Sequence, residues 1–484
     1  MRISVRRRVR PAVHLVACAL VLSACARNPV TGKTEISLVS ESQEIEMGRE
    51  GAQQVEQSIG LVDNDALQQY VQRVGANLAK DTERPKLPWT FRVVDDPTPN
   101  AFALPGGYIF VTRGLMGLMQ NEAELATVLG HEAGHVTARH QVRAITRAQL
   151  GQLALGIGSI LSPTVAQFGQ IAGTGMQLLF LKYDRAAETQ ADELGFRYAS
   201  RENYDVRQMP NVFEALQRLE QRENVSPLPS WLETHPGTAE RITHVQQLIA
   251  KAQPSAAGTV GGAQYLDRID GLVYGNNPRN GFFRGGVFMH PDLRFRIDFP
   301  QGWKTQNLSQ SVAAASPQQD AVIELTLAKG TPDQAIAAFA SQQGVQVGNV
   351  SREAVNGIPA STGVFQAQTQ QGTIQGYVAY LQYNGNTFQV VAYTPANAFG
   401  TYDRVFRQSI GSFAPLTDPQ ALAVQPNRID IVRLDAATTL AAFNQRSPSA
   451  IPIDELVIIN QVPSATSTLP AGTLVKRVVA GSAR

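Results

Sequence analysis

The stretch His131-Glu132-Ala133-Gly134-His135 decides how the first half of this chain folds. A helix turns about 100° per residue, so residues four apart lie on one face. Two imidazoles at that spacing can bind one Zn²⁺ ion, and the carboxylate of Glu132 lies beside them, within reach of a metal-bound water. Taken alone, the motif could also be a chance match on an amphipathic helix. Read as functional, it predicts a helix that carries a hydrolytic metal site.

A catalytic zinc needs a third protein ligand and one open position. Glu188 can supply that ligand, and Asp192, four residues further along the same predicted helix, can accept a hydrogen bond from a ligand imidazole. The alternative is the solvated face of an acidic helix. We expect one Zn²⁺ per chain, held by His131, His135 and Glu188. We exclude His140, because it lies about 180° round a continuous helix from His131.

Hydrophobic periodicity predicts helices and three short strands around these motifs. The helices cover residues 40–80 (two helices), 121–150, 183–200, 205–222 and 237–252, and the strands cover 91–94, 100–104 and 108–112. Residues 150–181 carry almost no charge. They predict either a hairpin of tightly packed helices or a lid or membrane-touching loop beside the site.

Four motifs, in this order, resemble a family of zinc metallopeptidases typified by the CAAX prenyl endopeptidase and the HtpX heat-shock protease. They are Asn100-Ala101-Phe102-Ala103-Leu104-Pro105-Gly106-Gly107, the HExxH of residues 131–135, the ExxxD of residues 188–192 with Gly195 after it, and His235-Pro236 followed by Arg241. The match covers residues 40–252, and periplasmic proteases such as BepA and LoiP look most similar. The resemblance implies a mainly helical, zincin-type catalytic domain with a small β-sheet over residues 41–252, and zinc-dependent endopeptidase activity.

The resemblance also implies roles for individual residues. Glu132 would act as the general base on a zinc-bound water. His235 and Arg241 correspond to a late His and Arg of the family, which would polarise the scissile carbonyl or stabilise the oxyanion. His235 could instead bind zinc as a fourth ligand and hold the enzyme latent, or be a surface residue. Residues 100–107 would lie at or beside the edge strand that pairs with the substrate backbone.

The first 25 residues are typical of an export leader. Residues 2–10 carry five Arg and no acidic residue, and the apolar run that follows, 11–24, is too short to span a bilayer. The run ends in Leu22-Ser23-Ala24-Cys25, which resembles a bacterial lipobox; the alternative is a plain signal peptide cut after a small residue. We expect a lipid on Cys25, a tether over residues 26–40, and a position on the periplasmic face of the outer membrane.

Composition excludes several functional classes. The 484 residues have a formal charge of +2, and removal of the five leader Arg leaves a charge near −3 (2 − 5), so we expect no nucleic-acid binding. Both cysteines, Cys18 and Cys25, lie in the leader or at its end. The mature protein would therefore have no disulfide, no thiolate ligand and no cysteine nucleophile, and His and carboxylates must hold any metal.

The second half of the chain has a different composition. After a small, polar linker over residues 253–264, alternating strands predict an α+β domain of unassigned role over residues 265–415. The segment 427–479 faintly resembles a LysM module, which would bind peptidoglycan; the alternative is an unrelated small α/β domain. The fold class predicted for the whole chain is therefore α+β and multidomain.

These observations together predict a zinc-dependent endopeptidase of the bacterial cell envelope that degrades misfolded or misassembled envelope proteins. Two other functions stay open. One is a latent or inactive zinc protein that acts as a chaperone or assembly factor for outer-membrane proteins. The other is a wall-binding protein that acts through its C-terminal half. The intact HExxH and ExxxD pair favours the enzyme.

Overall fold

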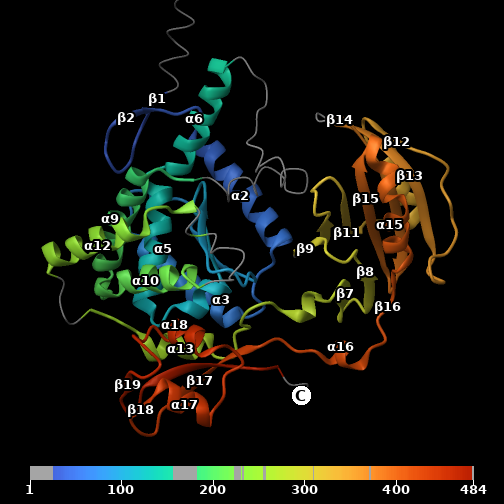
Figure 1. The fold of residues 1–484 in the computed structure, drawn as a ribbon. Helices are drawn as coiled ribbons and strands as arrows, with labels where there is room; N and C mark the ends of the chain where they lie inside the picture. Colours follow the sequence, from blue (N-terminus) through green and yellow to red (C-terminus); the bar gives the residue numbers. More distant parts are fainter. Residues whose placement is uncertain are drawn as a thin grey trace, which may run out of the picture. The chain divides into compact units, whose positions relative to one another are not determined.

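The computed structural model describes residues 25–155, 182–222, 231, 234–253, 258–308, 310–369 and 372–481 (Figure 1). The chain divides into two compact units: unit 1 is Met1–Leu272 with Ile429–Arg477, and unit 2 is Val273–Arg428 with Val478–Arg484. Helices and sheets occur in both, which confirms the predicted mixed α+β organisation. The predictions for the leader and for most of residues 150–181 lie outside the described residues.

Polar caps start the two helices that carry the site. α5 (Glu122–Thr137) begins after Asn121, and α9 (Arg185–Arg201) begins after Asp184. Each cap side chain accepts a hydrogen bond of 2.9 Å from the backbone N–H three residues further on. These bonds satisfy N–H groups that the first helical turn leaves unpaired, and they fix where each helix begins.

Most other elements of unit 1 fall close to the predicted ranges. They are the helices α2 (Glu41–Ser58), α3 (Asp65–Ala79), α10 (Met209–Glu220) and α12 (Thr238–Ala252), and the strands β3 (Thr90–Val94), β4 (Ala101–Leu104) and β5 (Tyr108–Thr112). Two further helices, α4 (Arg113–Leu118) and α13 (Gly262–Ile269), were not predicted, and α13 begins within the predicted linker. The three strands form one sheet in the order β3-β5-β4, in which β5 runs parallel to β3 and antiparallel to β4. β4 therefore lies at an edge of this sheet.

The single helix predicted over residues 121–150 is wrong. α5 ends at Thr137, and a separate helix, α6 (His140–Leu155), begins three residues later. Arg139, between them, has a φ of +57°, a left-handed conformation that costs a non-glycine residue about 1–2 kcal/mol. Its guanidinium donates a hydrogen bond of 3.0 Å to the buried carboxylate of Glu44, which offsets part of that cost. The break changes the position of His140.

Residues 26–40 differ from the tether predicted for them. β1 (Cys25–Arg27) pairs with β2 (Thr34–Ile36) as a short antiparallel hairpin. Asn28, in the turn, is buried, and its side-chain amide donates a hydrogen bond of 3.2 Å to the carbonyl of Ala138 at the end of α5. This bond satisfies a carbonyl that the end of α5 leaves without a partner. Through it, the hairpin packs against the break between α5 and α6.

Glycines bring α5 and α9 into direct backbone contact. A Cβ on Gly195 of α9 would lie 2.7 Å from the backbone nitrogen of His131, and one on Gly134 of α5 would lie 3.1 Å from the carbonyl oxygen of Ala191. No real Cβ sits as close as the first of these distances. The two glycines therefore let the HExxH helix and the ExxxD helix face each other at short range.

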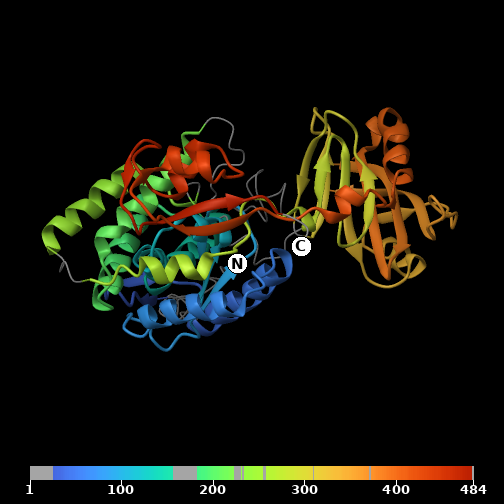
Figure 2. The same ribbon diagram turned by 90° about the horizontal axis from the view of Figure 1, so that it is seen from below.

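The C-terminal segment of unit 1 packs against the helices around α5. It contains β17 (Arg428–Arg433), β18 (Thr438–Thr439), α17 (Leu440–Arg446), α18 (Ile453–Ile459), β19 (Thr468–Leu469) and β20 (Leu474–Val479), and its strands are the red ribbons of Figure 2. β17 pairs with β20, and α18 contacts α4 and α10. Lys476 on β20 is fully buried, and its ammonium donates hydrogen bonds of 2.7 Å to the carbonyls of Gly117 and Met119. The segment is thus tied to the chain that leads into α5.

Unit 2 contains two antiparallel sheets and two longer helices. The seven-stranded sheet has the order β12-β13-β14-β15-β11-β10-β9, and the four-stranded sheet has the order β16-β8-β7-β6. The strands are β6 (Phe282–Arg284), β7 (Val287–His290), β8 (Phe295–Asp298), β9 (Lys304–Asn307), β10 (Ser311–Ala315), β11 (Val322–Ala328), β12 (Val345–Val347), β13 (Ala360–Thr369), β14 (Gly372–Tyr383), β15 (Asn386–Pro395) and β16 (Ala414–Pro415), and the helices are α14 (Pro332–Ala340), α15 (Phe399–Gly411) and the short α16 (Pro419–Ala423). Phe295, Phe388 and Phe413 are buried together in its core. Among the described residues of either unit, no helix combines the length and the apolar character needed to cross a bilayer.

Candidate active site

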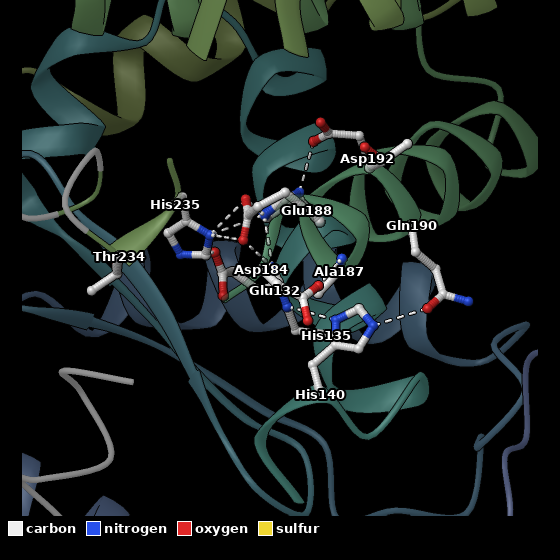
Figure 3. A network of polar contacts seen from close by, with 12 residues as sticks. Glu132, His135, His140, Asp184, Ala187, Glu188, Gln190, Asp192, Thr234 and His235 are labelled. Carbon is white, nitrogen blue, oxygen red and sulfur yellow. Dashed lines mark hydrogen bonds and ion pairs between the residues drawn. The ribbon is translucent and has the colours of Figure 1, made fainter. Parts of the chain in front are cut away.

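Four side chains from three parts of unit 1 meet in one buried cluster. His131 and His135 come from α5, Glu188 comes from α9, and His235 lies just before α12 (Figure 3). The four-residue cluster, as we call this set, is 0–1% exposed. His131 Nε2 lies 3.0 Å from His135 Nε2 and 3.3 Å from His235 Nδ1. The carboxylate of Glu188 lies 3.1 Å from His235 Nδ1, and 3.6 and 3.5 Å from the Nε2 atoms of the other two imidazoles.

The spacing and chemistry of these atoms fit a zinc ion. Zinc ligands lie about 2.0–2.1 Å from the ion, so neighbouring ligand atoms in a tetrahedron are about 3.3 Å apart. The five distances given above range from 3.0 to 3.6 Å. Burial lowers the pKa of each of the three imidazoles, that of His235 to about 4. They are therefore neutral, which is the form that binds a metal.

Glu132 lies next to the cluster, with one carboxylate oxygen 3.6 Å from Nε2 of His235. The side chain is fully buried, and neither carboxylate oxygen has a hydrogen-bond partner among the described residues. Burial raises the pKa of Glu132 to about 7. A buried acceptor without a partner is costly, so this position suits a group that receives a proton from a water. A carboxyl group with a pKa near the working pH is also suited to general base catalysis.

Asp192 and Arg241 contact members of the four-residue cluster. Asp192 Oδ1 lies 2.9 Å from Nδ1 of His131, where it accepts the hydrogen bond that the sequence predicts. Arg241, on α12, donates two hydrogen bonds of 2.6 and 2.8 Å to Asp192 and pairs with Glu188 at 3.0 Å. Burial disfavours the charge on Asp192, but the Arg241 guanidinium holds the pKa of this carboxyl well below its usual range. The guanidinium of Arg241 also lies 3.3 Å from Nδ1 of His131 and over the ring of Phe213.

Two aromatic rings pack against the imidazoles, and the sequence analysis singled out neither. Trp231 stacks on His235 with ring centroids 4.9 Å apart, and the guanidinium of Arg241 lies 4.8 Å from the Trp231 ring. Tyr183 stacks on His135 with centroids 3.9 Å apart. The spacing of Trp231, four residues before His235, was a usable signal. The only signal for Tyr183 in the sequence is its position shortly before the ExxxD motif.

His140 is not a member of the four-residue cluster, but it contacts His135, which the sequence analysis did not expect. Its Nδ1 lies 2.8 Å from Nδ1 of His135, and its Nε2 lies 3.0 Å from Oε1 of Gln190 (Figure 3). The exclusion assumed a continuous helix, whereas the chain breaks at Arg139 and brings His140 back against His135. Gln190 lies inside the ExxxD motif, but nothing in that motif assigned it a partner.

The segment expected to receive substrate lies at the sheet edge. Ala101–Leu104 form β4, and Pro105, Gly106 and Gly107 make the turn to β5. The four residues of β4 are 0–7% exposed in this structure. Pairing of a substrate strand with this edge therefore stays a prediction, and it requires the backbone of β4 to become accessible.

Residues 65–249 match Peptidase family M48. A beta-barrel assembly-enhancing protease of Escherichia coli (strain K12) is 30% identical over 236 residues, which are 47% of this chain and 48% of that protein. The protein of the same name from Yersinia pestis is 32% identical over 235 residues, with the same coverage. The mitochondrial metalloendopeptidase OMA1 of Schizosaccharomyces pombe is 32% identical over 191 residues, which are 38% of this chain and 53% of that protein.

The chain spans about half the length of the curated relatives it matches. The matched part contains α5, α9 and most of α12, and with them the whole four-residue cluster, Glu132, Asp192 and Arg241. The resemblance predicted from the four motifs is confirmed: residues 65–249 are a domain of peptidase family M48.

Proposed function

We propose that this chain is a zinc-dependent endopeptidase in which His131, His135 and Glu188 hold the metal and Glu132 is the general base. One observation carries the proposal. His131 and Glu188, 57 residues apart in sequence, lie 3.6 Å apart at Nε2 and Oε2, a distance compatible with two ligands of one zinc ion, and the carboxylate of Glu132 beside them accepts no hydrogen bond from the described residues. That arrangement lies within a peptidase family M48 domain.

The residues of the site support hydrolysis without a covalent enzyme intermediate. A bound Zn²⁺ would polarise the peptide carbonyl and lower the pKa of water to about 7. Glu132 takes a proton from the attacking water and later gives it to the leaving amine. Asp192 holds the tautomer of His131 that presents Nε2 to the metal, and Arg241 keeps Asp192 ionised.

The position of His235 supports the proposal that the protein also has a latent, inactive state. Its Nδ1 lies in the four-residue cluster, and its Nε2 lies 3.6 Å from Oε1 of Glu132. In this position the imidazole would supply a fourth ligand to a bound zinc and would take the place of the water that Glu132 activates. We propose that the structure represents a closed state and that His235 leaves this place when a substrate is cleaved.

The setting of the enzyme is proposed from its relatives and its leader. The relatives from Escherichia coli and Yersinia pestis are named for enhancing β-barrel assembly. We propose that this chain acts on misfolded or misassembled envelope proteins, and that a lipid on Cys25 holds it on the periplasmic face of the outer membrane. A chaperone or assembly role without cleavage is the alternative, and the closed site is the observation that favours it.

Metal removal tests the peptidase proposal. The chain as purified should contain one zinc and cleave an unfolded protein, a chelator should abolish cleavage, and added Zn²⁺ should restore it. Cleavage that persists after the zinc has been removed would contradict the proposal. One zinc with no cleavage, also after His235 has been changed to Ala, would favour the chaperone role.

The LysM-like segment needs a separate test. Its order of strand, two helices and strand is compatible with a peptidoglycan-binding module, and we keep that role as a proposal. Because residues 429–477 pack within unit 1, the test uses the full chain and not the isolated segment. Co-sedimentation with purified peptidoglycan supports the role, and the absence of binding removes it.

A further inference from the structure

A buried histidine outside the four-residue cluster contacts one of its members. His140 is 2% exposed and lies at the first position of α6. Its Nδ1 lies 2.8 Å from Nδ1 of His135, and its Nε2 lies 3.0 Å from Oε1 of Gln190 on α9 (Figure 3). The proposed mechanism gives this residue no part in the reaction.

The Nδ1 atoms of His135 and His140 can form a hydrogen bond only if one of them carries a proton and the other does not. His135 Nε2 faces the cluster, 3.0 Å from His131 Nε2 and 3.5 Å from Glu188 Oε1, so this atom must be free of a proton to bind an ion. The proton of the neutral His135 ring is then on Nδ1, and it is donated to Nδ1 of His140. His140 must therefore accept at Nδ1.

Gln190 selects the tautomer of His140 that can accept. An amide oxygen only accepts hydrogen bonds, so Oε1 of Gln190 pairs with a proton on Nε2 of His140. A neutral imidazole with its proton on Nε2 has an unprotonated Nδ1. The amide of Gln190 thus determines the proton position in His140, and His140 determines it in His135.

The two ligand histidines of α5 receive different support. Nδ1 of His131 donates to the carboxylate of Asp192, and Nδ1 of His135 donates to the neutral ring of His140. Gln190 and Asp192 both belong to α9, the helix that also supplies Glu188. A single helix therefore fixes the tautomers of both ligand imidazoles and supplies a ligand of its own.

We propose that His140 is a positioning residue, which holds His135 in the tautomer and orientation that bind the metal, and that Gln190 keeps His140 in its accepting form. The inference rests on the proposed metal site. It adds a residue that the HExxH and ExxxD motifs do not contain.

Zinc affinity, measured on the full chain by competition with a chromogenic chelator, tests this role. His140→Leu removes the acceptor and should weaken zinc binding about 10- to 100-fold, the usual effect of losing a ligand's hydrogen-bond partner. His140→Asn places an amide oxygen where Nδ1 lies, and should bind zinc within about threefold of the parent. His244→Leu, on α12 and outside these contacts, is the matched control and should change nothing. Parental affinity in His140→Leu, or equal losses in the Leu and Asn variants, would overturn the proposal.

A metal-free measurement separates this inference from the proposed peptidase function. In the apo full chain with ¹⁵N-labelled histidine, two-bond ¹⁵N–¹H spectra should show His135 protonated at Nδ1. His140→Leu should give a mixture of His135 tautomers, and His140→Asn should restore the single form. Protonation of His135 at Nε2 in the parent, or an unchanged His135 spectrum in His140→Leu, would overturn the proposal. A chain that binds zinc and shows this pattern but cleaves nothing would fail only as a peptidase.

Discussion

The two nitrogen atoms of His235 face two different parts of the site. Nδ1 contacts His131 and Glu188, and Nε2 faces Glu132, so one ring contacts both the proposed metal ligands and the proposed base. The stacked ring of Trp231 holds this orientation. The residue therefore affects turnover in opposite directions, depending on whether it blocks the site or stabilises the oxyanion.

His235→Ala separates these two roles by the sign of its effect. In the closed-state account, only about 0.1–10% of the parent molecules have His235 out of the site and can cleave. Removal of the His235 side chain should therefore raise cleavage of an unfolded protein about tenfold or more. Loss of an oxyanion stabiliser would instead lower cleavage by about 10²–10³. Turnover should be measured with the zinc content of both proteins matched. A decrease would contradict the closed-state account.

From the surroundings of His290, in β7 of unit 2, we expect the free energy of unfolding to depend on pH for a reason that does not involve the proposed metal site. Its Nδ1 accepts a hydrogen bond of 3.2 Å from the backbone of Leu293, its ring stacks on Phe295, and burial lowers the pKa of His290 to about 4. Between about pH 6.5, the usual His pKa, and pH 4 the folded state binds fewer protons than the unfolded state, so stability is lost as the pH falls. The parent should lose about 1–2 kcal/mol more than His290→Gln between pH 7.5 and 5, allowing for the partial exposure of the ring. Urea unfolding at both pH values measures this, and equal losses would contradict it.

At the scale of elements, the site depends on how closely α5 and α9 approach. Gly134 and Gly195 line the contact, and a side chain on either would meet the backbone of the other helix. Since α5 carries two of the proposed ligands and α9 carries the third, the separation of the helices sets the distance between His131 and Glu188. Packing at this contact is therefore part of the metal site.

Gly195→Ala should open the site without changing a ligand. Its Cβ would lie 2.7 Å from the backbone nitrogen of His131, so α9 must move away from α5. We expect a loss of about 1–3 kcal/mol in unfolding free energy and a weakening of zinc binding of about tenfold or more. Gly400→Ala, in α15 with no atom within 4 Å of the new Cβ, is the control and should keep or slightly raise stability. Parental zinc affinity in Gly195→Ala would contradict the packing argument.

How far the sequence predicts this site depends on the element. The HExxH and ExxxD spacings indicate the ligands because a helix puts residues four apart on one face, and Asn121 and Asp184 mark where the helices begin. The break at Arg139 has no such signal, since neither Gly nor Pro stands there. The break depends on contacts with Glu44 and Asn28, which are distant in sequence. For that reason the sequence predicted neither the contact between His140 and His135 nor the packing of residues 26–40 against the helices.

At the scale of the whole molecule, residues 429–477 pack against the helices of unit 1 that carry and precede the candidate site. Buried Lys476 bonds the carbonyls at the end of α4, and Gln461 donates a hydrogen bond of 2.9 Å to the buried carboxylate of Glu124 in the first turn of α5. Sequence patterns predicted strands and helices here but not this contact, because a lone Lys in a strand gives no sign that it is buried.

Lys476→Met should destabilise unit 1. Methionine keeps the length of the side chain but leaves the carbonyls of Gly117, Leu118 and Met119 without their shared donor. A buried unsatisfied group costs about 1–3 kcal/mol, so we expect a loss of about 2–4 kcal/mol in unfolding free energy. Lys251→Met, at an exposed position of α12, is the control and should have little effect. Equal stability of the two variants in urea would show that this contact does not hold the segment in place.

The central claim is that Glu132 is the base of a zinc peptidase, and a comparison of residues 26–484 with Glu132→Gln tests it most directly. Zinc content and cleavage of an unfolded protein are measured together, in the parental and the His235→Ala backgrounds. The account predicts one zinc per chain in every protein, and cleavage that falls at least about 10²–10⁴-fold with Glu132→Gln. Near-parental cleavage by Glu132→Gln with its zinc in place would contradict it.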